Sequence, residues 1–114
     1  MIKLFGIPNC DTIKKAKKWL EQNNIEYTFH DYRKDGVDSE MVNTFCQQLD
    51  WQQVLNKRGT TYRQLDDATK ESLNAESAVA LLVEQPAMIK RPILEKDGEL
   101  HLGFKADQYQ SIFS

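Results

Sequence analysis

The stretch IKLFGIPNCDTIKKAKKWL, residues 2–20, decides the fold because it encodes a strand, a turn and an amphipathic helix in succession. Ile2–Phe5 has the pattern of a short β-strand, which a glycine and a proline end. Cys10 lies where the turn meets the helix, which is expected over residues 11–23. The helix is predicted from apolar residues spaced three and four positions apart: Ile13, Ala16 and Leu20.

The middle of the chain is predicted to be mainly helical after a second strand. The aromatic-rich segment 27–32 is expected to form that strand. Apolar residues on one helical face predict a helix over residues 39–49, and Asn74 is positioned to cap a further helix over residues 75–84. Residues 50–73 are polar and irregular, so only short helical turns are expected there.

A β-hairpin is the clearest local pattern near the C-terminus. Asp97-Gly98 separates strand patterns at residues 93–96 and 99–102, and a two-residue turn with positive φ angles suits this dipeptide. A last helix is expected over residues 106–113. The first strand, helix and second strand imply a parallel pair, and the hairpin adds antiparallel strands. The predicted fold class is therefore α/β, a mixed sheet flanked by helices, with a helical insertion.

The composition is that of a soluble globular protein. With 114 residues, 40% hydrophobic and 28% charged, the chain can bury a core, so one domain over residues 1–114 is expected. A net charge of −2 disfavours direct binding of nucleic acid. No apolar run approaches a membrane span, and no signal peptide is recognisable, so we expect a cytoplasmic monomer without a membrane partner. Two cysteines there should be reduced, and they are too few for a typical zinc site.

Cys10 combines a nucleophilic side chain with a favourable position. The first N–H groups of a helix lack backbone partners, so a thiolate placed there is stabilised and its pKa falls. The thiolate is the reactive form. An inert loop cysteine is the alternative that local sequence leaves open. Asp11 opposes the thiolate, whereas four lysines either support it or only form a solvated helix face: Lys14, Lys15, Lys17 and Lys18.

Three other candidates are better explained by packing. Cys46 falls on the apolar face of the helix predicted over residues 39–49, where a small buried side chain is expected rather than a resolving thiol. His30 and His101 lie in strand-like segments distant in sequence from Cys10, so structural roles are favoured over general-base roles.

Three separated segments carry a resemblance to a known family: Gly6–Thr12, Asn56–Thr61 and Lys90–Ile93. In this order and spacing they resemble the arsenate reductase (ArsC) and Spx/MgsR-related family over nearly the whole chain. The resemblance is greatest to its YffB-type branch of small reductase-like proteins. It implies a thioredoxin-like fold, a catalytic cysteine at Cys10, glutathione as co-substrate and no metal.

The resemblance also implies which residues bind substrate. Arg58 and Arg91 are expected to bind an anion or glutathione, because a guanidinium can hold an oxyanion through two hydrogen bonds and stabilise a nearby thiolate. Lys57 is a rival to Arg58, and a surface ion pair is the alternative role of each arginine. Pro92 is expected in the cis form and facing the active cysteine, as in thioredoxin-like folds.

Three further residues complete the expected site. Thr12 can donate its hydroxyl to the Cys10 thiolate or cap the helix. Asn9 belongs to the same segment and is assigned to substrate binding. Lys105 adjoins the position where arsenate reductases of this family have a third arginine; this chain has Phe104 there, and an ammonium lacks the fork geometry of arginine.

Departures from the family pattern separate three possible functions. Ile13 occupies the second position of the Cys-x-x-Cys pair of Spx-type switches, so no local disulfide can form and an external thiol is needed. This favours a glutathione-dependent monothiol reductase. A regulator that binds RNA polymerase without turnover is one alternative, since a fold does not determine function. Arsenate reduction is another, and the missing third arginine argues against it.

Overall fold

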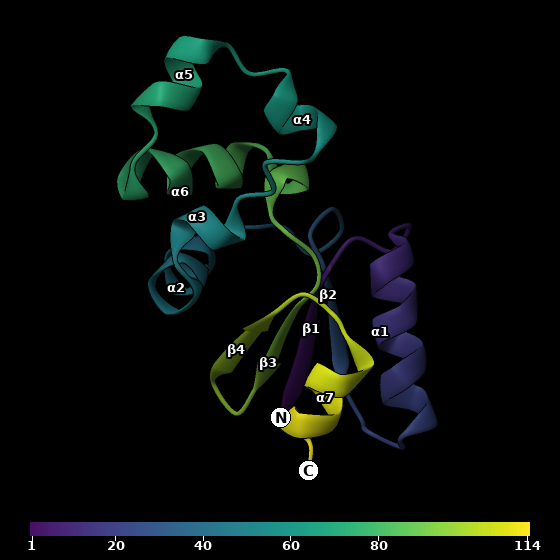
Figure 1. The fold of residues 1–114 in the computed structure, drawn as a ribbon. Helices are drawn as coiled ribbons and strands as arrows, with labels where there is room; N and C mark the ends of the chain where they lie inside the picture. Colours follow the sequence, from purple (N-terminus) through teal and green to yellow (C-terminus); the bar gives the residue numbers. More distant parts are fainter. The chain divides into compact units, whose positions relative to one another are not determined.

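The computed structural model describes residues 1–114, which form two compact units (Figure 1). The terminal unit combines both ends of the chain, Met1–Asp35 and Arg91–Ser114. The helical unit is the internal segment Gly36–Lys90. The expectation of a single domain stays a prediction. None of the helices has the length and apolar character that crossing a membrane requires.

The terminal unit is built on a four-stranded sheet with the strand order β2-β1-β3-β4. β1 (Ile2–Gly6) runs parallel to β2 (Thr28–Asp31) and antiparallel to β3 (Ile93–Lys96). β3 pairs in turn with β4 (Glu99–Leu102). The predicted mixed sheet is confirmed. The pairing also places β3 beside β1, which the local patterns did not specify.

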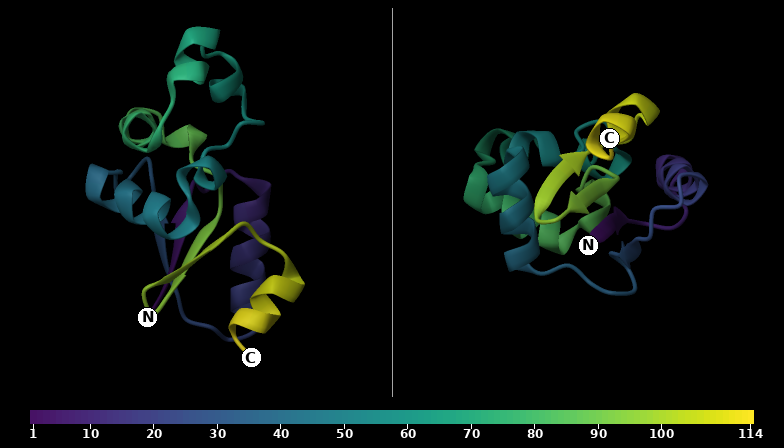
Figure 2. Two further views of the ribbon diagram at one scale, coloured as in Figure 1. Left: turned by 60° about the vertical axis from the view of Figure 1, so that its left-hand side comes forward. Right: turned by 90° about the horizontal axis from the view of Figure 1, so that it is seen from below.

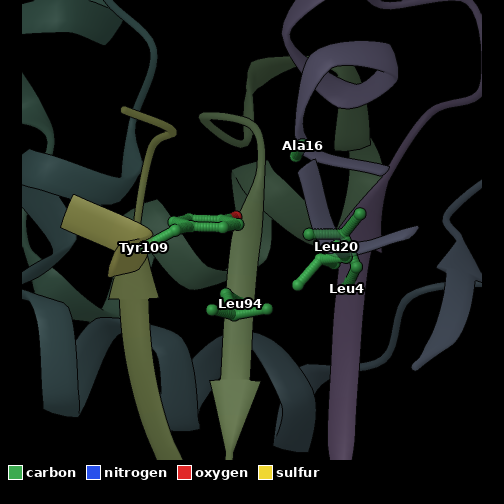
Figure 3. Close-up of a cluster of buried hydrophobic side chains, with 5 residues drawn as sticks. All are labelled: Leu4, Ala16, Leu20, Leu94 and Tyr109. Carbon is green, nitrogen blue, oxygen red and sulfur yellow. The ribbon is translucent and has the colours of Figure 1, made fainter. Parts of the chain in front are cut away.

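Two helices, α1 (Asp11–Gln22) and α7 (Ala106–Ile112), cover one face of this sheet (Figure 2). Leu4 and Leu94 are register partners on β1 and β3, so their side chains lie on that same face. A fully buried cluster joins strands and helices (Figure 3): Leu4, Ala16, Leu20, Leu94 and Tyr109. Burial of this cluster contributes to the hydrophobic stabilisation of the unit.

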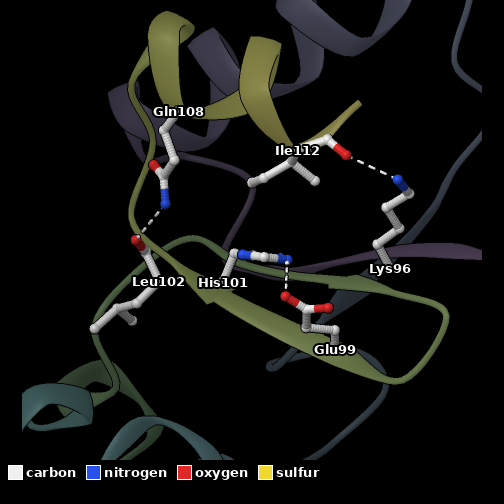
Figure 4. A network of polar contacts seen from close by, with 6 residues as sticks. All are labelled: Lys96, Glu99, His101, Leu102, Gln108 and Ile112. Carbon is white, nitrogen blue, oxygen red and sulfur yellow. Dashed lines mark hydrogen bonds and ion pairs between the residues drawn. The ribbon is translucent and has the colours of Figure 1, made fainter. Parts of the chain in front are cut away.

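Hydrogen bonds tie α7 to the β3–β4 hairpin at both ends of the helix (Figure 4). The Lys96 ammonium donates to the carbonyl of Ile112 at 2.8 Å. The Gln108 carboxamide donates to the carbonyl of Leu102 at 3.1 Å. A cation near the last helical turn also interacts favourably with the helix dipole. These contacts fix α7 against the strand that follows Arg91.

The helical unit consists of short segments: α2 (Ser39–Leu49), α3 (Trp51–Val54), α4 (Thr60–Arg63), α5 (Asp67–Ser72), α6 (Ala75–Glu84) and the 3₁₀ helix η1 (Pro86–Met88). Helix α2 packs against α3 and α6. Asn74 caps α6 through a reciprocal pair of hydrogen bonds with Ser77, as the sequence predicts. An antiparallel bridge between the buried residues Leu55 and Ile89 closes the unit.

Most predicted elements are confirmed, with small differences at their ends. Asp97 and Gly98 have φ angles of 51° and 88°, as the expected hairpin turn requires. Strand β2 lacks both terminal residues of the predicted segment 27–32. The polar segment 50–73 contains three short helices, two of which begin at aspartate caps that satisfy the first N–H groups.

Gly6 is the point of closest approach between β1 and α1. A Cβ atom at this residue would lie 2.9 Å from Cγ1 of Ile13 and closer still to its Cδ1. Ile13 is fully buried, so its side chain has little room to move. A glycine is therefore required for α1 to begin where it does, directly after Cys10.

We expect Gly6→Ala to lower the free energy of unfolding by about 1–3 kcal/mol, because the added methyl overpacks the junction. Ile13→Val removes the nearest carbon and should cost about 0.5–1.5 kcal/mol by itself. The double variant should lose less than the sum of the two single changes. Chemical denaturation of all four proteins measures this coupling. Strict additivity would show that the two residues do not compete for the same space.

Candidate active site

Cys10 lies at the junction of β1 and α1, as the sequence predicts. It is the N-cap residue of α1, with φ −98° and ψ 129°, and its carbonyl accepts the first helical hydrogen bond from Lys14 at 3.0 Å. The side chain is partly exposed and unpaired with any other cysteine. Its sulfur makes no capping hydrogen bond of standard geometry, so α1 begins without a conventional side-chain cap.

The environment of Cys10 lowers the pKa of its thiol. Partial burial is the largest single effect and acts to raise this pKa, but several lowering effects together outweigh it, led by hydrogen bonds from the backbone N–H of Ile13 and from Arg91. The N–H of Thr12 and the positive charge of Arg91 act in the same direction. The helix start and one guanidinium therefore stabilise the thiolate, which is the nucleophilic form.

Arg91 reaches Cys10 because of the sheet register. Ile93 is the partner of Phe5, near the end of β1, so the residues before Ile93 continue past that end toward Cys10. Arg91 is half-buried, and its peptide bond to Pro92 is cis, as predicted. That Pro92 faces the active cysteine stays a prediction. The carbonyl of Pro92 accepts a hydrogen bond from Gly103 at 2.8 Å. The structure thus brings the first and third sequence segments together.

Tyr32 lies near Arg91, and the sequence patterns did not identify it as part of the site. It follows β2, its backbone N–H donates to the carbonyl of Gly6 at 3.0 Å, and only 2% of the residue is exposed. Its hydroxyl is buried without a hydrogen-bond partner. Burial raises the pKa of Tyr32 strongly, and the charge of Arg91 opposes that effect. The residue appeared only as the end of an aromatic strand, and no local pattern marks its proximity to Arg91.

Other predicted site residues of the terminal unit lie at the surface or in the first turn. Asn9 is exposed next to Cys10, and Thr12 lies in the first turn of α1, where its N–H acts on the sulfur. The roles of the Thr12 hydroxyl and of Asn9 stay predictions. Lys105 is the exposed N-cap residue of α7, and its role in binding also stays a prediction.

Arg58 and Lys57 belong to the helical unit. Both side chains are exposed, and both line a pocket of about 280 Å³ that Lys90 also lines. The backbone N–H of Arg58 donates to the Asn56 side chain at 3.3 Å, which shapes the turn. The sequence does not decide whether Lys57 or Arg58 is the basic binding residue of the segment Asn56–Thr61. In the structure, both residues line the same pocket.

Residues assigned to packing have environments that fit that role. Cys46 is half-buried, and burial raises the pKa of its thiol, as does the carboxylate of Asp50. His30 packs its ring against Phe5, with the ring centroids 5.2 Å apart. The chain contains no group of three or more His, Cys, Asp or Glu side chains placed to hold a metal ion.

Comparison with known proteins places this chain in a family. The chain matches the ArsC family over residues 5–112. The chain belongs to the ArsC family. It is similar to an uncharacterized protein of Haemophilus influenzae, 46% identical over 114 residues, which cover 100% of both chains. The solved structure of the YFFB (PA3664) protein is 45% identical, covers 100% of both chains and has a TM-score of 0.95.

A more distant relative is a regulator by its name. Global transcriptional regulator Spx 1 of Bacillus cereus is 26% identical over 110 residues, which are 95% of this chain and 83% of that protein. The predicted family and the thioredoxin-like fold are confirmed. The chain is also similar to the solved structure of an arsenate reductase (ArsC) related protein from Brucella melitensis, which is 48% identical, with 99% of this chain and 94% of that chain covered and a TM-score of 0.81. Its relatives therefore include both a protein described as arsenate reductase related and Spx regulators.

The two departures from the family pattern have clear structural roles in this ArsC-family chain. Ile13 is fully buried against Gly6, so the second position of a Cys-x-x-Cys pair is occupied by a core side chain. Phe104 packs edge-on against Tyr109, with the ring centroids 4.7 Å apart. The position expected for a third arginine therefore contributes to the packing of α7.

We expect Arg91→Gln to raise the pKa of Cys10, because the variant removes a hydrogen-bonding cation from the thiolate. The rate of Cys10 alkylation at pH 7 should fall several-fold, since a smaller fraction of the thiol is ionised. Intact-mass kinetics against pH, in a Cys46→Ala background, measure the midpoint. Lys18→Gln, which removes an exposed charge from α1, is the matched control. An unchanged midpoint in Arg91→Gln would contradict the assignment.

We expect Tyr32→Phe to leave the free energy of unfolding unchanged or to increase it by up to about 2 kcal/mol, because an unpaired buried hydroxyl is unfavourable. Tyr27→Phe, at a half-exposed position, should have no effect. Thermal and chemical denaturation provide the measurement. A clear loss of stability in Tyr32→Phe alone would reveal a partner for the hydroxyl.

Proposed function

We propose that this ArsC-family protein is a monothiol reductase in which Cys10 is the nucleophile and glutathione is the co-substrate. The observation that carries the proposal is the position of Cys10 at the N-cap of α1 next to Arg91, an environment that lowers the pKa of its thiol. A thiolate at neutral pH attacks disulfide sulfur far faster than a thiol does. A low thiol pKa serves little purpose in a side chain that only packs.

The proposed reaction has two thiol–disulfide exchanges. The Cys10 thiolate attacks the glutathione sulfur of a mixed disulfide R–S–S–G; the S–S bond breaks, R–S⁻ leaves, and Cys10–S–S–G forms. A glutathione thiolate then attacks this new disulfide, releases the Cys10 thiolate and forms G–S–S–G. The proton lost by glutathione is taken up by R–S⁻. The sum is R–S–S–G plus one G–SH giving R–SH and G–S–S–G, so R is reduced to its thiol while the free glutathione and the glutathionyl group of the substrate end in one disulfide.

An external thiol is proposed because the chain offers no suitable second thiol to resolve a disulfide formed at Cys10. Ile13 occupies the local position, and the thiol of Cys46 has a raised pKa, which makes it a poor attacking group near neutral pH. Glutathione carries two carboxylates that a guanidinium can hold.

We propose that several side chains bind glutathione around the Cys10 sulfur. Arg91 supplies the positive charge next to the thiolate, and Thr12 supplies a hydroxyl in the first helical turn. The remaining proposed contacts come from residues of the terminal unit that the family resemblance assigns: Asn9, Pro92 and Lys105. The resemblance also assigns Arg58, which belongs to the helical unit, to substrate binding. The cytoplasm, where glutathione is abundant, is the proposed compartment.

The similarity to Spx 1 favours a second candidate, a regulator that binds RNA polymerase without turnover. Such a regulator would need a surface that binds the polymerase, and it would not need a thiol with a lowered pKa. The absence of a Cys-x-x-Cys pair removes the disulfide switch from this alternative. Arsenate reduction has less support, because Phe104 fills the position expected for the third arginine.

Incubation with oxidised glutathione should attach one glutathionyl group to Cys10, and reduced glutathione should remove it. Intact mass spectrometry of the wild type, Cys10→Ser and Cys46→Ala proteins measures this modification. Cys46→Ala should react like the wild type, and Cys10→Ser should not react. A low Cys10 pKa without any mixed disulfide would reject glutathione. Recovery of RNA polymerase subunits by such a protein would then support the regulator, and Cys10-dependent arsenate turnover would support the arsenate reductase.

A further inference from the structure

The hydroxyl of Tyr32 is a buried polar group near the candidate active site, and the proposed reaction gives it no role. Only 2% of Tyr32 is exposed, and its hydroxyl makes no hydrogen bond. A buried hydroxyl without a partner is unfavourable, because the folded chain does not replace the hydrogen bonds that water offers to the unfolded chain. Phenylalanine would fill nearly the same space without that loss. The hydroxyl is therefore a candidate functional group.

The sheet places Tyr32 and Arg91 on the two sides of the end of β1. β2 runs parallel to β1 with Asp31 opposite Gly6, so Tyr32 follows at the carboxyl end of β1. β3 runs antiparallel to β1, so Arg91 lies beyond the same end on the other side. The backbone N–H of Tyr32 donates to the carbonyl of Gly6 at 3.0 Å, which fixes the chain after β2 against β1.

The ring of Tyr32 belongs to the sheet face opposite α1 and α7. Its centroid lies 6.1 Å from that of His30, whose ring packs against Phe5. Phe5 alternates along β1 with Leu4, which packs with the helices. Burial raises the pKa of Tyr32 strongly, and the charge of Arg91 opposes that effect. The phenol therefore stays neutral at physiological pH and lies within the electrostatic reach of the guanidinium.

The Cys10 thiolate is an anionic partner of Arg91 that the proposed reaction consumes. Arg91 is the charged group that acts on the Cys10 sulfur, and it also forms a hydrogen bond to it. When the thiolate attacks a disulfide, the negative charge passes to the departing thiolate, and the sulfur left behind is a weak acceptor. A phenol oxygen can accept from the guanidinium in that state. Unlike a carboxylate, it does so without cancelling the positive charge.

We propose that Tyr32 is a positioning residue for Arg91, whose guanidinium donates to the Tyr32 hydroxyl whenever the Cys10 sulfur is uncharged. This hydrogen bond keeps the cation beside the sulfur while Cys10 is in a mixed disulfide. The same cation then stabilises the thiolate that is released when a second thiol attacks. The inference rests on the proposed reaction at Cys10, but it does not depend on glutathione as the thiol.

The test compares protein with a free Cys10 and protein blocked at Cys10 by methyl methanethiosulfonate, in a Cys46→Ala background. The Cys10 thiolate attacks the sulfenyl sulfur of the reagent, forms Cys10–S–S–CH3 and releases methanesulfinate. This cap is small, neutral and unrelated to glutathione. Chemical denaturation is measured for both forms, with and without Tyr32→Phe, at a pH above the midpoint of Cys10 alkylation.

We expect Tyr32→Phe to have opposite effects in the two forms. In the free form, the folding equilibrium constant should stay the same or rise, since the hydroxyl has no partner there. In the blocked form, it should fall about three- to tenfold, because a hydrogen bond to the guanidinium is lost. The alkylation midpoint should move to lower pH by about half a unit to one unit, because the protonated thiol is also uncharged and loses the same support.

Tyr109→Phe is the matched control. Tyr109 is fully buried and its hydroxyl also lacks a partner, but it lies in the core cluster with Leu4 and Leu94, and burial alone raises its pKa. Its substitution should have the same effect in both forms and leave the alkylation midpoint unchanged.

Equal effects of Tyr32→Phe in the free and blocked forms, with an unchanged alkylation midpoint, would overturn the inference. That result would leave the proposed reductase intact, because uptake of a glutathionyl group at Cys10 is measured separately. A wild-type protein that takes up no glutathionyl group would reject glutathione as the co-substrate. The comparison of the free and methylthiolated forms would still decide the role of Tyr32.

Discussion

The close approach of β1 to α1 at Gly6 is the constraint on which the rest of the site depends. Ile13 fills the space beside the glycine and is fully buried, so the first turn of α1 has one position relative to the strand. Cys10 is the residue that connects them, and its sulfur therefore lies beside the free N–H groups of that turn. Packing of an apolar side chain thus determines the electrostatic environment of the thiol.

The second constraint is the pairing of β1 with β3. It joins two segments about ninety residues apart in sequence, because Phe5 is opposite Ile93. Arg91 then lies past the end of β1 and acts on both Cys10 and Tyr32. The Arg91 guanidinium acts to lower the pKa of both a partly exposed thiol, Cys10, and a buried phenol, Tyr32. The hairpin and α7, held by the Lys96 and Gln108 hydrogen bonds, keep this strand in place.

Local sequence patterns predicted the elements well and the contacts between them poorly. The hairpin at Asp97-Gly98 and the cap at Asn74 follow from residues within a few positions, so they could be read directly. The placement of β3 beside β1 depends on long-range pairing, and the proximity of Tyr32 to Arg91 depends on that placement. The family resemblance identified Arg91 as a site residue, but it did not identify Tyr32, and it did not indicate that Lys90 lines the same pocket as Lys57.

Core packing and thiol chemistry make competing demands on the first turn of α1. The residue three positions after Cys10 faces β1, where a cysteine would leave part of the space beside Gly6 unfilled. Ile13 fills that space, and as a consequence the turn has no resolving thiol. The backbone N–H of Ile13 nevertheless lowers the pKa of Cys10, so the same residue helps to create the nucleophile. Packing at this junction therefore leaves one cysteine in the first turn of α1, and the proposed reductase reaction takes its reductant from outside the chain.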